Sequence, residues 1–306
     1  MVDKPTVISL FAGYGGSSLG YQMADFRELL AVEWDNNAVE TFRLNFPDIS
    51  IYNGDIAKLS GEECMKLAGI QKDELDVLDG SPPCQGFSIA GKRRFTDPRN
   101  LLFQEYARLL TDLQPKIFVM ENVTGMIKGY MKQVYLEIMR VLRGCGYKAK
   151  GEVLNAMYFN VPQSRERVII IGVREDLGIE PSHPKPQTQA LGLKEALGLK
   201  EALGLRRGWG IRCGDGIKNK QFHNKWRSLD LPCMTLEKIR PPILLQNGIE
   251  RDLTLSECAK IASFPDSFIW GKKAYQGIGN AVPPLLMKII AEHIRDNILD
   301  KAVKLD

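Results

Sequence analysis

Short apolar runs alternate with amphipathic stretches over roughly the first 175 residues of the chain, and this alternation predicts its fold. The runs have the length and β-branched content of buried strands. They are Val7–Phe11, Leu29–Val32, Asp76–Asp79, Ile117–Met120 and Val168–Val173. Helical periodicity lies between them, clearest over Leu101–Leu113 and Gln133–Leu142. Strands that alternate with helices predict an α/β fold whose mostly parallel sheet is covered by helices on both faces.

The pattern weakens after Glu175, where Pro181, Pro184 and Pro186 indicate an exit from the first domain. Helical periodicity returns over Leu255–Phe264 and again over Met287–Ile298. We therefore expect a large domain made of residues 1–178 and 272–306, and a small domain made of residues 179–271.

A six-residue repeat lies within the predicted small domain. Ala190–Glu195 reads ALGLKE, Ala196–Glu201 repeats it, and Ala202–Leu205 begins a third copy. Six residues are too few for a solenoid unit. We interpret the repeat as a local expansion of a helical turn and a half, without chemistry of its own.

Composition excludes several classes of protein. The chain has 306 residues, of which 44% are hydrophobic and 25% charged, as in a soluble globular protein. No apolar stretch approaches the ~20 residues of a membrane span, and the first residues show no secretion signal. The six cysteines are dispersed without a C-x-x-C pair, which argues against a metal site or disulfide framework and for a reducing, cytoplasmic setting.

Charge is distributed unevenly along the chain. Residues 185–251 hold 13 Lys or Arg against 6 Asp or Glu, a net of +7, whereas the remainder carries a net of −3. A basic segment on a nearly neutral body is typical of a surface that faces nucleic acid. A solvated loop region would give the same charge pattern, so charge alone does not decide between the two.

A glycine-rich turn follows the first predicted strand and precedes a helix, at Phe11–Gly16. Such a turn allows a ligand to approach backbone amides closely. Glu33 ends the next strand, where a carboxylate can bind a ribose diol, and Asp55 follows a further strand end, where it would suit the amine of an adenine. The turn is not the dinucleotide pattern G-x-G-x-x-G, because Ser18 occupies the third glycine position.

The segment Gly80–Ser88 contains the cysteine that is hardest to interpret as structural. It follows a strand, and two prolines fix the backbone immediately before Cys84, which lowers the entropic cost of holding a nucleophile in one place. Glu121 lies at the end of the strand Ile117–Met120 and would meet Cys84 at the same edge of the sheet.

These segments together resemble the ordered motifs of the cytosine-C5 DNA methyltransferases. Pro-Pro-Cys-Gln, Glu-Asn-Val at Glu121–Val123 and Gln163–Arg167 carry the resemblance. Other segments match further motifs in the family's order: Phe11–Gly16, Glu33-Trp34, Gly54-Asp55, Arg99–Phe103, Pro232–Thr235 and Gly277–Pro283. The resemblance spans Phe11 to Pro283 and implies a Rossmann-like fold with a smaller target-recognition lobe.

The family uses S-adenosylmethionine, and the resemblance implies which residues bind it. These are Phe11, Gly13, Gly15, Gly16, Glu33, Trp34, Asp55, Ile56, Pro83, Leu102, Asn280 and Val282. Asn280 and Val282 would close the site against the first glycine-rich turn, which requires the C-terminal helix to pack on the large domain.

The implied reaction begins with addition of the Cys84 thiolate to C6 of cytosine, which makes C5 nucleophilic toward the sulfonium methyl group. Glu121, protonated, would stabilise charge at N3. Arg167 is the first candidate for contact with O2 and Arg165 the second. Phosphate binding or a surface ion pair is an alternative role for Arg165.

Because the nucleophile must approach perpendicular to the ring, the target base has to leave the duplex. The basic segment Gly86–Arg99 resembles the family's loop over DNA, although a solvated basic loop is the alternative. Only 64 residues separate Arg167 from Pro232, which predicts a short or degenerate target sequence. The residues expected to contact DNA are Lys92, Arg93, Arg94, Arg206, Arg207, Arg212 and Thr235, and the wider set of candidates includes Trp209, Lys218, Lys220, Lys225 and Arg227.

The resemblance further implies double-stranded DNA as partner, a monomer, and a setting in restriction–modification with an independent endonuclease. Three rival classes stay open: an RNA methyltransferase of the same fold, a non-catalytic DNA-binding protein, and a nicotinamide-dependent oxidoreductase. Gly86-Phe87-Ser88 favours the DNA enzyme over the first, and the intact Cys84 and Glu121 disfavour the second. Ser18 disfavours the third.

Overall fold

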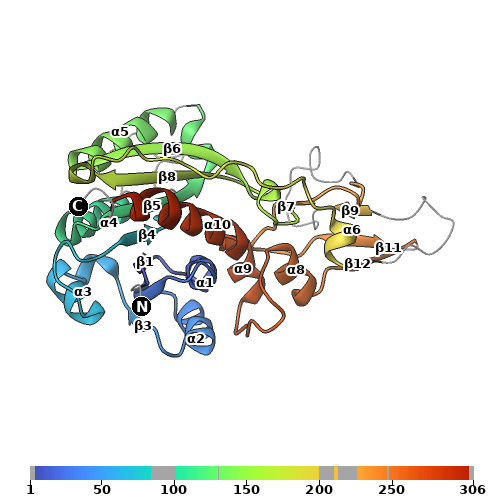
Figure 1. Cartoon of the computed structure of the whole chain (residues 1–306). Coiled ribbons are helices and arrows are strands. Elements are labelled where there is room, and N and C mark those ends of the chain that lie inside the picture. The colour runs from blue at the N-terminus through green and yellow to red at the C-terminus, as the bar shows by residue number, and fades with distance from the viewer. Residues whose placement is uncertain are drawn as a thin grey trace.

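The computed structural model describes residues 4–83, 101–129, 131–199, 210–212, 226–246 and 248–302. Its centre is a seven-stranded sheet with the strand order β3-β2-β1-β4-β5-β8-β6, drawn in Figure 1. In that order the strands are β3 (Ser50–Asn53), β2 (Arg27–Glu33), β1 (Thr6–Leu10), β4 (Val77–Gly80), β5 (Ile117–Val123), β8 (Glu166–Arg174) and β6 (Tyr147–Asn155). The first five are parallel, whereas β8 runs antiparallel to both of its neighbours.

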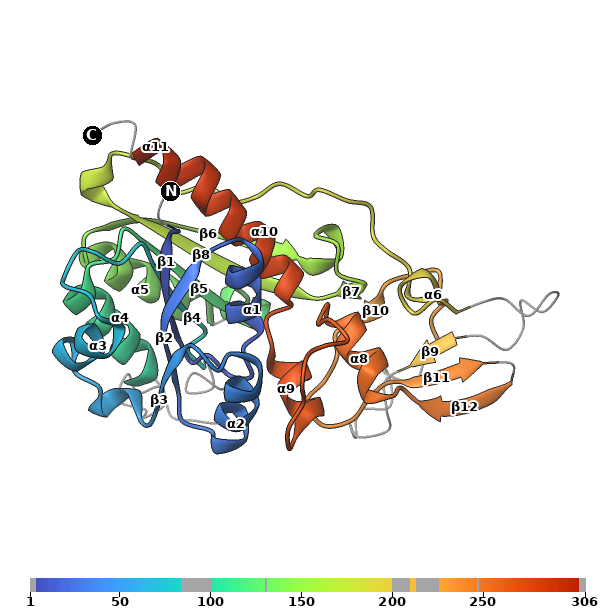
Figure 2. The same cartoon turned by 60° about the horizontal axis from the view of Figure 1, so that its bottom comes forward.

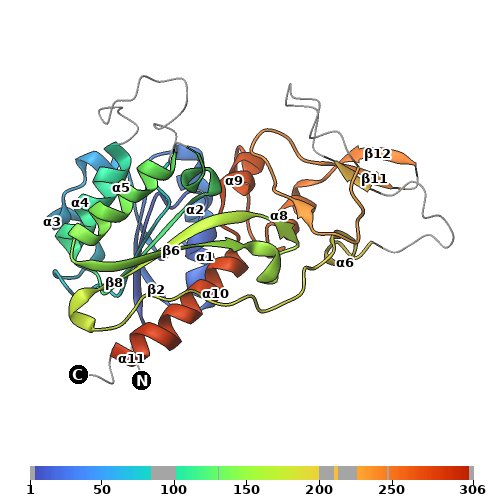
Figure 3. The ribbon, with the colours of Figure 1, turned by 90° about the horizontal axis from the view of Figure 1, so that it is seen from above.

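Helices cover both faces of the sheet, and each face has its own apolar core. One core lies beneath α3 (Gly61–Ala68), α4 (Leu101–Leu113) and α5 (Met131–Gly144). The other lies beneath α1 (Gly16–Met23) and α10 (Pro284–Ile294). Helix α10 packs directly on α1, so the end of the chain returns to its beginning, as Figure 3 also shows from above.

Local sequence fixes the helix ends. Asp35 caps α2 (Asn36–Asn45) by accepting from the amides of Asn37 and Ala38, and Ser60 caps α3. Thr254 and Glu257 form a reciprocal capping box at the start of α8 (Leu255–Ile261). Beyond α10 the chain makes one π-helical turn, Arg295–Leu299, and ends its described part in α11 (Asp300–Ala302).

A smaller lobe lies beside the sheet (Figure 2). It contains the three-stranded sheet β12-β11-β9 and the short parallel pair of β7 with β10. The bounds are β7 (Gln163–Ser164), β9 (Gly210–Arg212), β10 (Cys233–Met234), β11 (Ile243–Gln246), β12 (Ile249–Asp252), α6 (Leu193–Ala196) and α9 (Ala274–Asn280). A third core joins the lobe to α2, because Phe42 and Phe46 pack with Leu229, Leu244 and Phe264.

The predicted α/β class with helices on both faces is confirmed, and α4 has the bounds that its periodicity predicts. Several details differ. Strand β6 was not among the predicted elements. Helix α8 ends at Ile261 rather than Phe264, and α10 begins at Pro284, since proline favours the first turn of a helix. Within its described residues the repeat forms only the four-residue helix α6, which ends at Ala196 and is followed by Gly198 in the left-handed conformation.

The chain between the large sheet and the small lobe stays attached to the sheet for several residues. Ile179 packs on the core beneath α10, and the buried ring of His183 donates from Nε2 to the carbonyl oxygen of Ile169 at 2.9 Å. The amides of Gln187 and Thr188 then bond to the carbonyl oxygen of Tyr158. This segment therefore crosses the large domain before it reaches α6, a path that is visible in Figure 2.

Candidate functional site

The strand register brings the predicted site residues to one edge of the sheet. Leu10, Gly80 and Met120 are paired across β1, β4 and β5, so the segments that follow them leave the sheet at the same edge. Because β8 is antiparallel to β5, its first residues lie at that edge too, and Arg167 is paired with Val123. Parallel sheets place their sites at this edge.

The glycine-rich turn after β1 is held by the carboxylate of Glu33. The Gly13 amide donates to Oε2 of Glu33 at 2.8 Å, while the amides of Trp34 and Asp35 donate to Oε1, each at 2.8 Å. Phe11, Gly13 and Gly15 all have positive φ, which lets the backbone fold tightly at the end of the strand. Glu33 thus has a structural role in the turn that the sequence did not reveal.

The two glycine-rich segments, near the two ends of the chain, pack against each other. A Cβ on Gly16 would lie 2.4 Å from the carbonyl oxygen of Val282, and one on Gly277 would lie 2.6 Å from the ring of Tyr14. Only glycine allows these approaches. The structure therefore brings Val282 against the first turn, while Asn280 is exposed at the end of α9.

The residues beside this turn have the chemistry needed to bind an adenine nucleoside. Trp34 is 75% exposed and offers an open aromatic face, while Ile56 is buried. Asp55 caps the short helix η1 (Ile56–Lys58) through one carboxylate oxygen, which accepts from the Ala57 amide at 3.0 Å. Leu102 is half-buried and Pro83 is exposed at the same edge. An open aromatic face, apolar side chains and a carboxylate that can accept from an amine thus lie at this edge, and they fit the adenosine part of S-adenosylmethionine.

Asn122 anchors the segment that leads to the predicted nucleophile. Its amide nitrogen donates to the carbonyl oxygen of Pro82 at 2.9 Å, and its amide oxygen accepts from Val123 at 2.9 Å. Asn122 is buried, so both bonds are shielded from water. Cys84 itself lies outside the described residues. The sequence motif contained Asn122, but its anchoring role follows only from the fold.

Glu121, Arg167 and Arg165 form a charged cluster at the end of β5. Nε of Arg167 lies 2.8 Å from Oε1 of Glu121, and both side chains are largely buried. Arg165 is more deeply buried, at 2% exposure, and donates from Nη2 to the carbonyl oxygen of Gly279 at 3.0 Å. Its Nε has no hydrogen-bond partner. Burial, and then the nearby charge of Arg167, lower the pKa of Arg165 to about 9, which leaves it charged at neutral pH.

Two acidic groups are buried beneath α1. Asp79 lies on β4, paired with Ser9 of β1, and accepts from the Tyr21 hydroxyl at 3.4 Å. Glu28 accepts from the Ser18 hydroxyl at 3.0 Å. Burial raises the pKa of Asp79 to about 8 and that of Glu28 to about 7, and Glu28 adds to the rise at Asp79. These acids were not among the predicted site residues.

Among the predicted DNA contacts, the structure describes two. Arg212 bonds to Glu250 at 3.0 Å and lies over the ring of Trp226, so its guanidinium is engaged within the small lobe. Thr235 donates to the carbonyl oxygen of Ser164 at 2.8 Å and thereby connects the lobe to the strand that carries the arginines. The others lie outside the described residues: Lys92, Arg93, Arg94, Arg206 and Arg207.

A small-lobe segment that the sequence did not single out lies beside this cluster. A Cβ on Gly279 would meet the backbone nitrogen of Lys238 at 2.6 Å. The next residues, Ile239 and Arg240, are exposed, with Ile239 at 64%. An exposed apolar side chain between two cations has no structural function here, so these residues join the candidates for contact with a ligand.

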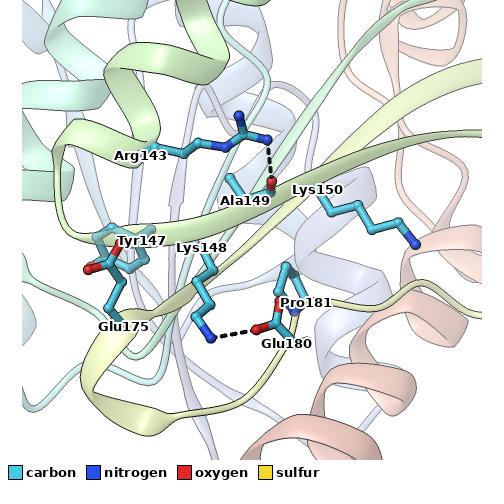
Figure 4. A pocket seen from close by; sticks show the side chains of 8 residues that line it. All are labelled: Arg143, Tyr147, Lys148, Ala149, Lys150, Glu175, Glu180 and Pro181. Carbon is cyan, nitrogen blue, oxygen red and sulfur yellow. Dashed lines mark hydrogen bonds and ion pairs between the residues drawn. The ribbon is translucent and has the colours of Figure 1, made fainter.

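A hollow of about 380 Å³ lies elsewhere, between β6 and the segment after β8 (Figure 4). Lys148 there pairs with Glu180, and Arg143 donates to the carbonyl oxygen of Ala149. Lys148 is opposite Val173 on β8, six residues from Arg167 and hence about 20 Å along the strand. Since it is far from the edge described above, the hollow is not part of the site.

Within the described ranges, no three His, Cys, Asp or Glu side chains are grouped so as to hold a metal ion. None of the helices described is long and apolar enough to cross a membrane.

Solved structures share this architecture. The chain aligns over 97% of its length with the whole of a putative DNA modification methyltransferase encoded within an Escherichia coli prophage, with a TM-score of 0.76 and 24% identity. It also aligns with the Dnmt2 methyltransferase of Schizosaccharomyces pombe, with a TM-score of 0.68 and 19% identity over 95% of this chain and 97% of that one. The fold is thus that of the Rossmann-like methyltransferases.

Sequence comparison defines the family. The family model described as C-5 cytosine-specific DNA methylase matches residues 5–207 and 206–296. The type II methyltransferase M1.HphI of Haemophilus parahaemolyticus is 37% identical over 94% of this chain and 86% of its own length. M.FnuDI of Fusobacterium nucleatum is 32% identical over 96% and 95%. The chain belongs to the C-5 cytosine-specific DNA methylase family and is a DNA (cytosine-5-)-methyltransferase.

Proposed function

We propose that the chain transfers the methyl group of S-adenosylmethionine to C5 of a flipped-out cytosine in double-stranded DNA, through a covalent bond between Cys84 and C6. The observation that carries this proposal is the ion pair of Glu121 with Arg167. It lies beside Asn122, which holds the Pro82–Pro83 segment immediately before Cys84. This arrangement at one edge of the sheet supports the proposal.

The cofactor would lie across the turn after β1. Bound there, S-adenosylmethionine supplies an electrophilic methyl group. Glu33 would hold the ribose hydroxyls, while the hydrogen bonds that its carboxylate accepts from backbone amides keep the turn folded. Trp34 and Ile56 would enclose the adenine, and Asp55 would accept from its amine. The other proposed binding residues are Phe11, Gly13, Gly15, Gly16, Pro83, Leu102, Asn280 and Val282. The packing of Gly16 on Val282 supports the inclusion of Val282.

The reaction would begin with addition of the Cys84 thiolate to C6, which breaks the aromatic conjugation and leaves an electron pair at C5. C5 would then form a bond to the methyl group as the bond between that group and the sulfonium sulfur breaks, which leaves S-adenosylhomocysteine. A water molecule would accept the C5 proton, the electron pair of that C–H bond would restore the double bond between C5 and C6, and Cys84 would leave C6 as a thiolate. In this structure Glu121 pairs with Arg167 as a carboxylate; in the reaction its protonated form would donate to N3, while Arg167 would hold O2. Both side chains would share the charge that develops on the ring, in a site shielded from water.

Arg165 would act as a positioning residue rather than touch the base. Its guanidinium is buried and directed to the Gly279 carbonyl oxygen, so it would hold Arg167 and Glu121 in place from behind. A buried cation beside Glu121 also offsets the negative charge of that carboxylate.

DNA would bind between the sheet edge and the small lobe, which corresponds to the proposed division into residues 1–178 with 272–306 and residues 179–271. The basic residues Lys92, Arg93, Arg94, Arg206 and Arg207 would bind phosphates. Lys238–Arg240 lies next to the catalytic cluster and is better placed for the bases than Arg212, which is held by Glu250. The relatives are named type II methyltransferases, which supports a role in restriction–modification. The proposal includes a monomer that acts in the cytoplasm, with an endonuclease that works independently.

A mechanism-based trap tests this proposal. Duplex DNA that contains 5-fluorocytosine would be incubated with the enzyme and cofactor, because fluorine at C5 cannot leave as a cation and the covalent complex should persist. We expect a denaturation-resistant adduct with the wild-type enzyme and none with Cys84→Ser. An adduct only with fluorinated transfer RNA would reassign the substrate, and no adduct with either, despite cofactor binding, would refute the covalent mechanism.

A further inference from the structure

The first repeat copy is docked on the small lobe through contacts that the chain offers twice. The docked segment is Ala190–Leu199, with the sequence ALGLKEALGL. The segment Ala196–Leu205 has the same ten-residue sequence. We refer to them as the first and second docking segments.

The docking is specific, because it uses backbone bonds, a buried side chain and a tight glycine contact. The amide of Leu193 donates to the carbonyl oxygen of Leu231 at 3.0 Å, and that of Lys194 donates to Leu229 at 2.8 Å. Leu193 is fully buried in the third core. A Cβ on Gly192 would lie 2.7 Å from the carbonyl oxygen of Asp230.

The second half of the docked segment closes the helix. Gly198 has φ +61°, its amide bonds to the Glu195 carbonyl, and the Leu199 amide bonds to the Lys194 carbonyl at 3.0 Å. This is a Schellman ending, which requires a glycine followed by an apolar residue. Docking therefore requires two glycines, six residues apart, and the chain has three such glycines: Gly192, Gly198 and Gly204.

We propose that the small lobe has a single docking site that accepts either segment, so that the chain exists in two registers displaced by six residues. In the second register Gly198 takes the place of Gly192, Leu199 that of Leu193, and Gly204 that of Gly198. Every contact within the ten residues is reproduced, so the two registers differ only in the connections at each end.

Those connections can accommodate the shift. Lys194 and Ile211 are bonded to Leu229 and Arg227, which are two residues apart on one short segment. In the second register four residues, 206–209, join Leu205 to Gly210, and these span about 17 Å when extended. On the other side, the linker after Thr188 gains six residues, and the free energy of closing a loop changes only slowly with its length.

The shift has a consequence for DNA binding. That consequence rests on the proposed function, whereas the docking of the repeat on the small lobe does not. Arg206 is seven residues beyond the end of the first docking segment and directly follows the second. The register therefore sets how far the basic pair Arg206-Arg207 extends from the small lobe.

Glycine substitutions test the two registers. Gly192 has φ −68° and ψ 148°, which valine adopts readily, so Gly192→Val blocks only the first register, by its clash with Asp230. Gly204→Val blocks only the second. We expect each single variant to lower the melting temperature by no more than about 2 °C, and the double variant to lower it by more than about 6 °C. Gly198 is required in both registers, so Gly198→Val should lower the melting temperature as much as the double variant does.

Two outcomes would overturn the proposal. If Gly192→Val alone is as damaging as the double variant, only one register exists. If the double variant is tolerated, Asp230 accommodates the side chain and the glycine contact is not specific.

Hydrogen exchange of backbone amides gives an independent measurement. In Gly192→Val, protection should be lost at Leu193 and Lys194 and gained at Lys200, whereas the Leu199 amide is bonded in both registers. Unchanged protection at Lys194 would contradict the second register. Neither stability nor exchange depends on methyl transfer, so a failure of the fluorocytosine trap and a failure of the register shift are separate results.

Discussion

The buried guanidinium of Arg165 bonds to the backbone carbonyl of Gly279, 114 residues further along the chain. This bond connects the strand that carries Arg167 to the end of α9, next to the small-lobe segment at Lys238. Arg165, which is 2% exposed, thus joins the edge of the sheet that carries Arg167 to the end of α9.

We predict that Arg165→Met lowers kcat by about 10²-fold and changes the affinity for S-adenosylmethionine little. Methionine fills the volume but leaves Gly279 without its donor and Glu121 without the charge behind it. Replacing a buried charge with an apolar side chain can be neutral for stability, so the melting temperature should change by only a few degrees. Equal losses in kcat and cofactor affinity would indicate general unfolding instead.

Asn122→Asp should lower kcat by about 10- to 100-fold, because a carboxylate cannot donate to the Pro82 carbonyl and repels it. The yield of covalent adduct with fluorocytosine DNA would fall in parallel. Asn155→Asp is the matched control, since the oxygen that accepts from Met157 is retained. An unchanged rate of adduct formation in Asn122→Asp would show that the hydrogen bond from Asn122 to the Pro82 carbonyl is dispensable.

Glu33→Gln should weaken S-adenosylmethionine binding about tenfold and cost about 1–3 kcal/mol of stability. The amide group offers only one accepting oxygen to the three backbone amides that Glu33 now binds. Titration calorimetry and thermal unfolding measure the two effects. The exposed Glu40→Gln on α2 should change neither, and a Glu33→Gln variant that behaves in the same way would refute the role of Glu33.

The two buried acids make stability depend on pH. The pKa of Asp79 is about 8 in the folded protein and about 3.9 in an unfolded chain. Between these values the folded state keeps a proton that the unfolded state has lost. The contribution of Asp79 to stability is therefore fully present below about pH 4 and is lost as pH rises to about 8. The contribution of Glu28 is lost in the same direction, as pH rises to about 7.

Asp79→Asn removes the larger part of this dependence, so the variant should be more stable than wild type at pH 8.5, by about 1–3 kcal/mol, and should differ less at pH 5. Thermal unfolding across this pH range measures the difference. Asp48→Asn, at an exposed position, serves as the control and should run parallel to the wild type. An Asp79→Asn curve parallel to the wild type would show that Asp79 does not hold the proton.

Gly16→Ala should destabilise the protein by about 2–4 kcal/mol and weaken cofactor binding, because its Cβ would lie 2.4 Å from the Val282 carbonyl oxygen. At Gly144, the last residue of α5, a Cβ meets no atom within 4 Å. Gly144→Ala should therefore be neutral or stabilising by about 0.5–1 kcal/mol. Similar melting temperatures for the two variants would contradict the close packing of the two glycine-rich segments.

The strands and helices that the sequence predicted are those in which burial follows a simple pattern along the element. Strands β4 and β5 are buried on both faces and read as continuous apolar runs, and α4 has a strong amphipathic period. Strand β6 was missed because it is an edge strand in which Lys148, Lys150 and Glu152 interrupt the apolar pattern. The small-lobe strands are short, and β12 is largely exposed, so no period of two is visible there.

The motif residues Glu33, Glu121 and Arg167 lie near the strand ends at which the sequence predicted them, while their roles stay predictions. What could not be predicted depends on contacts across the chain. The direction of the Arg165 side chain depends on Gly279, and the amides bound by Glu33 depend on the positive φ of the glycine-rich turn. The buried pair of Glu28 and Asp79 lies on strands that are separated in sequence and adjoin β1 from opposite sides.

The antiparallel direction of β8 carries the chain away from the catalytic edge before it returns to the small lobe. Arg167 is fixed at one end of this strand, and the segment after Arg174 crosses the large domain, anchored at His183 and Thr188, before it enters the lobe. The chain returns through α9, whose end is fixed at Gly279. Both connections are anchored to the large domain, so genetic exchange of the intervening stretch between relatives would replace the proposed target-recognition lobe while Arg167 and its strand are inherited unchanged.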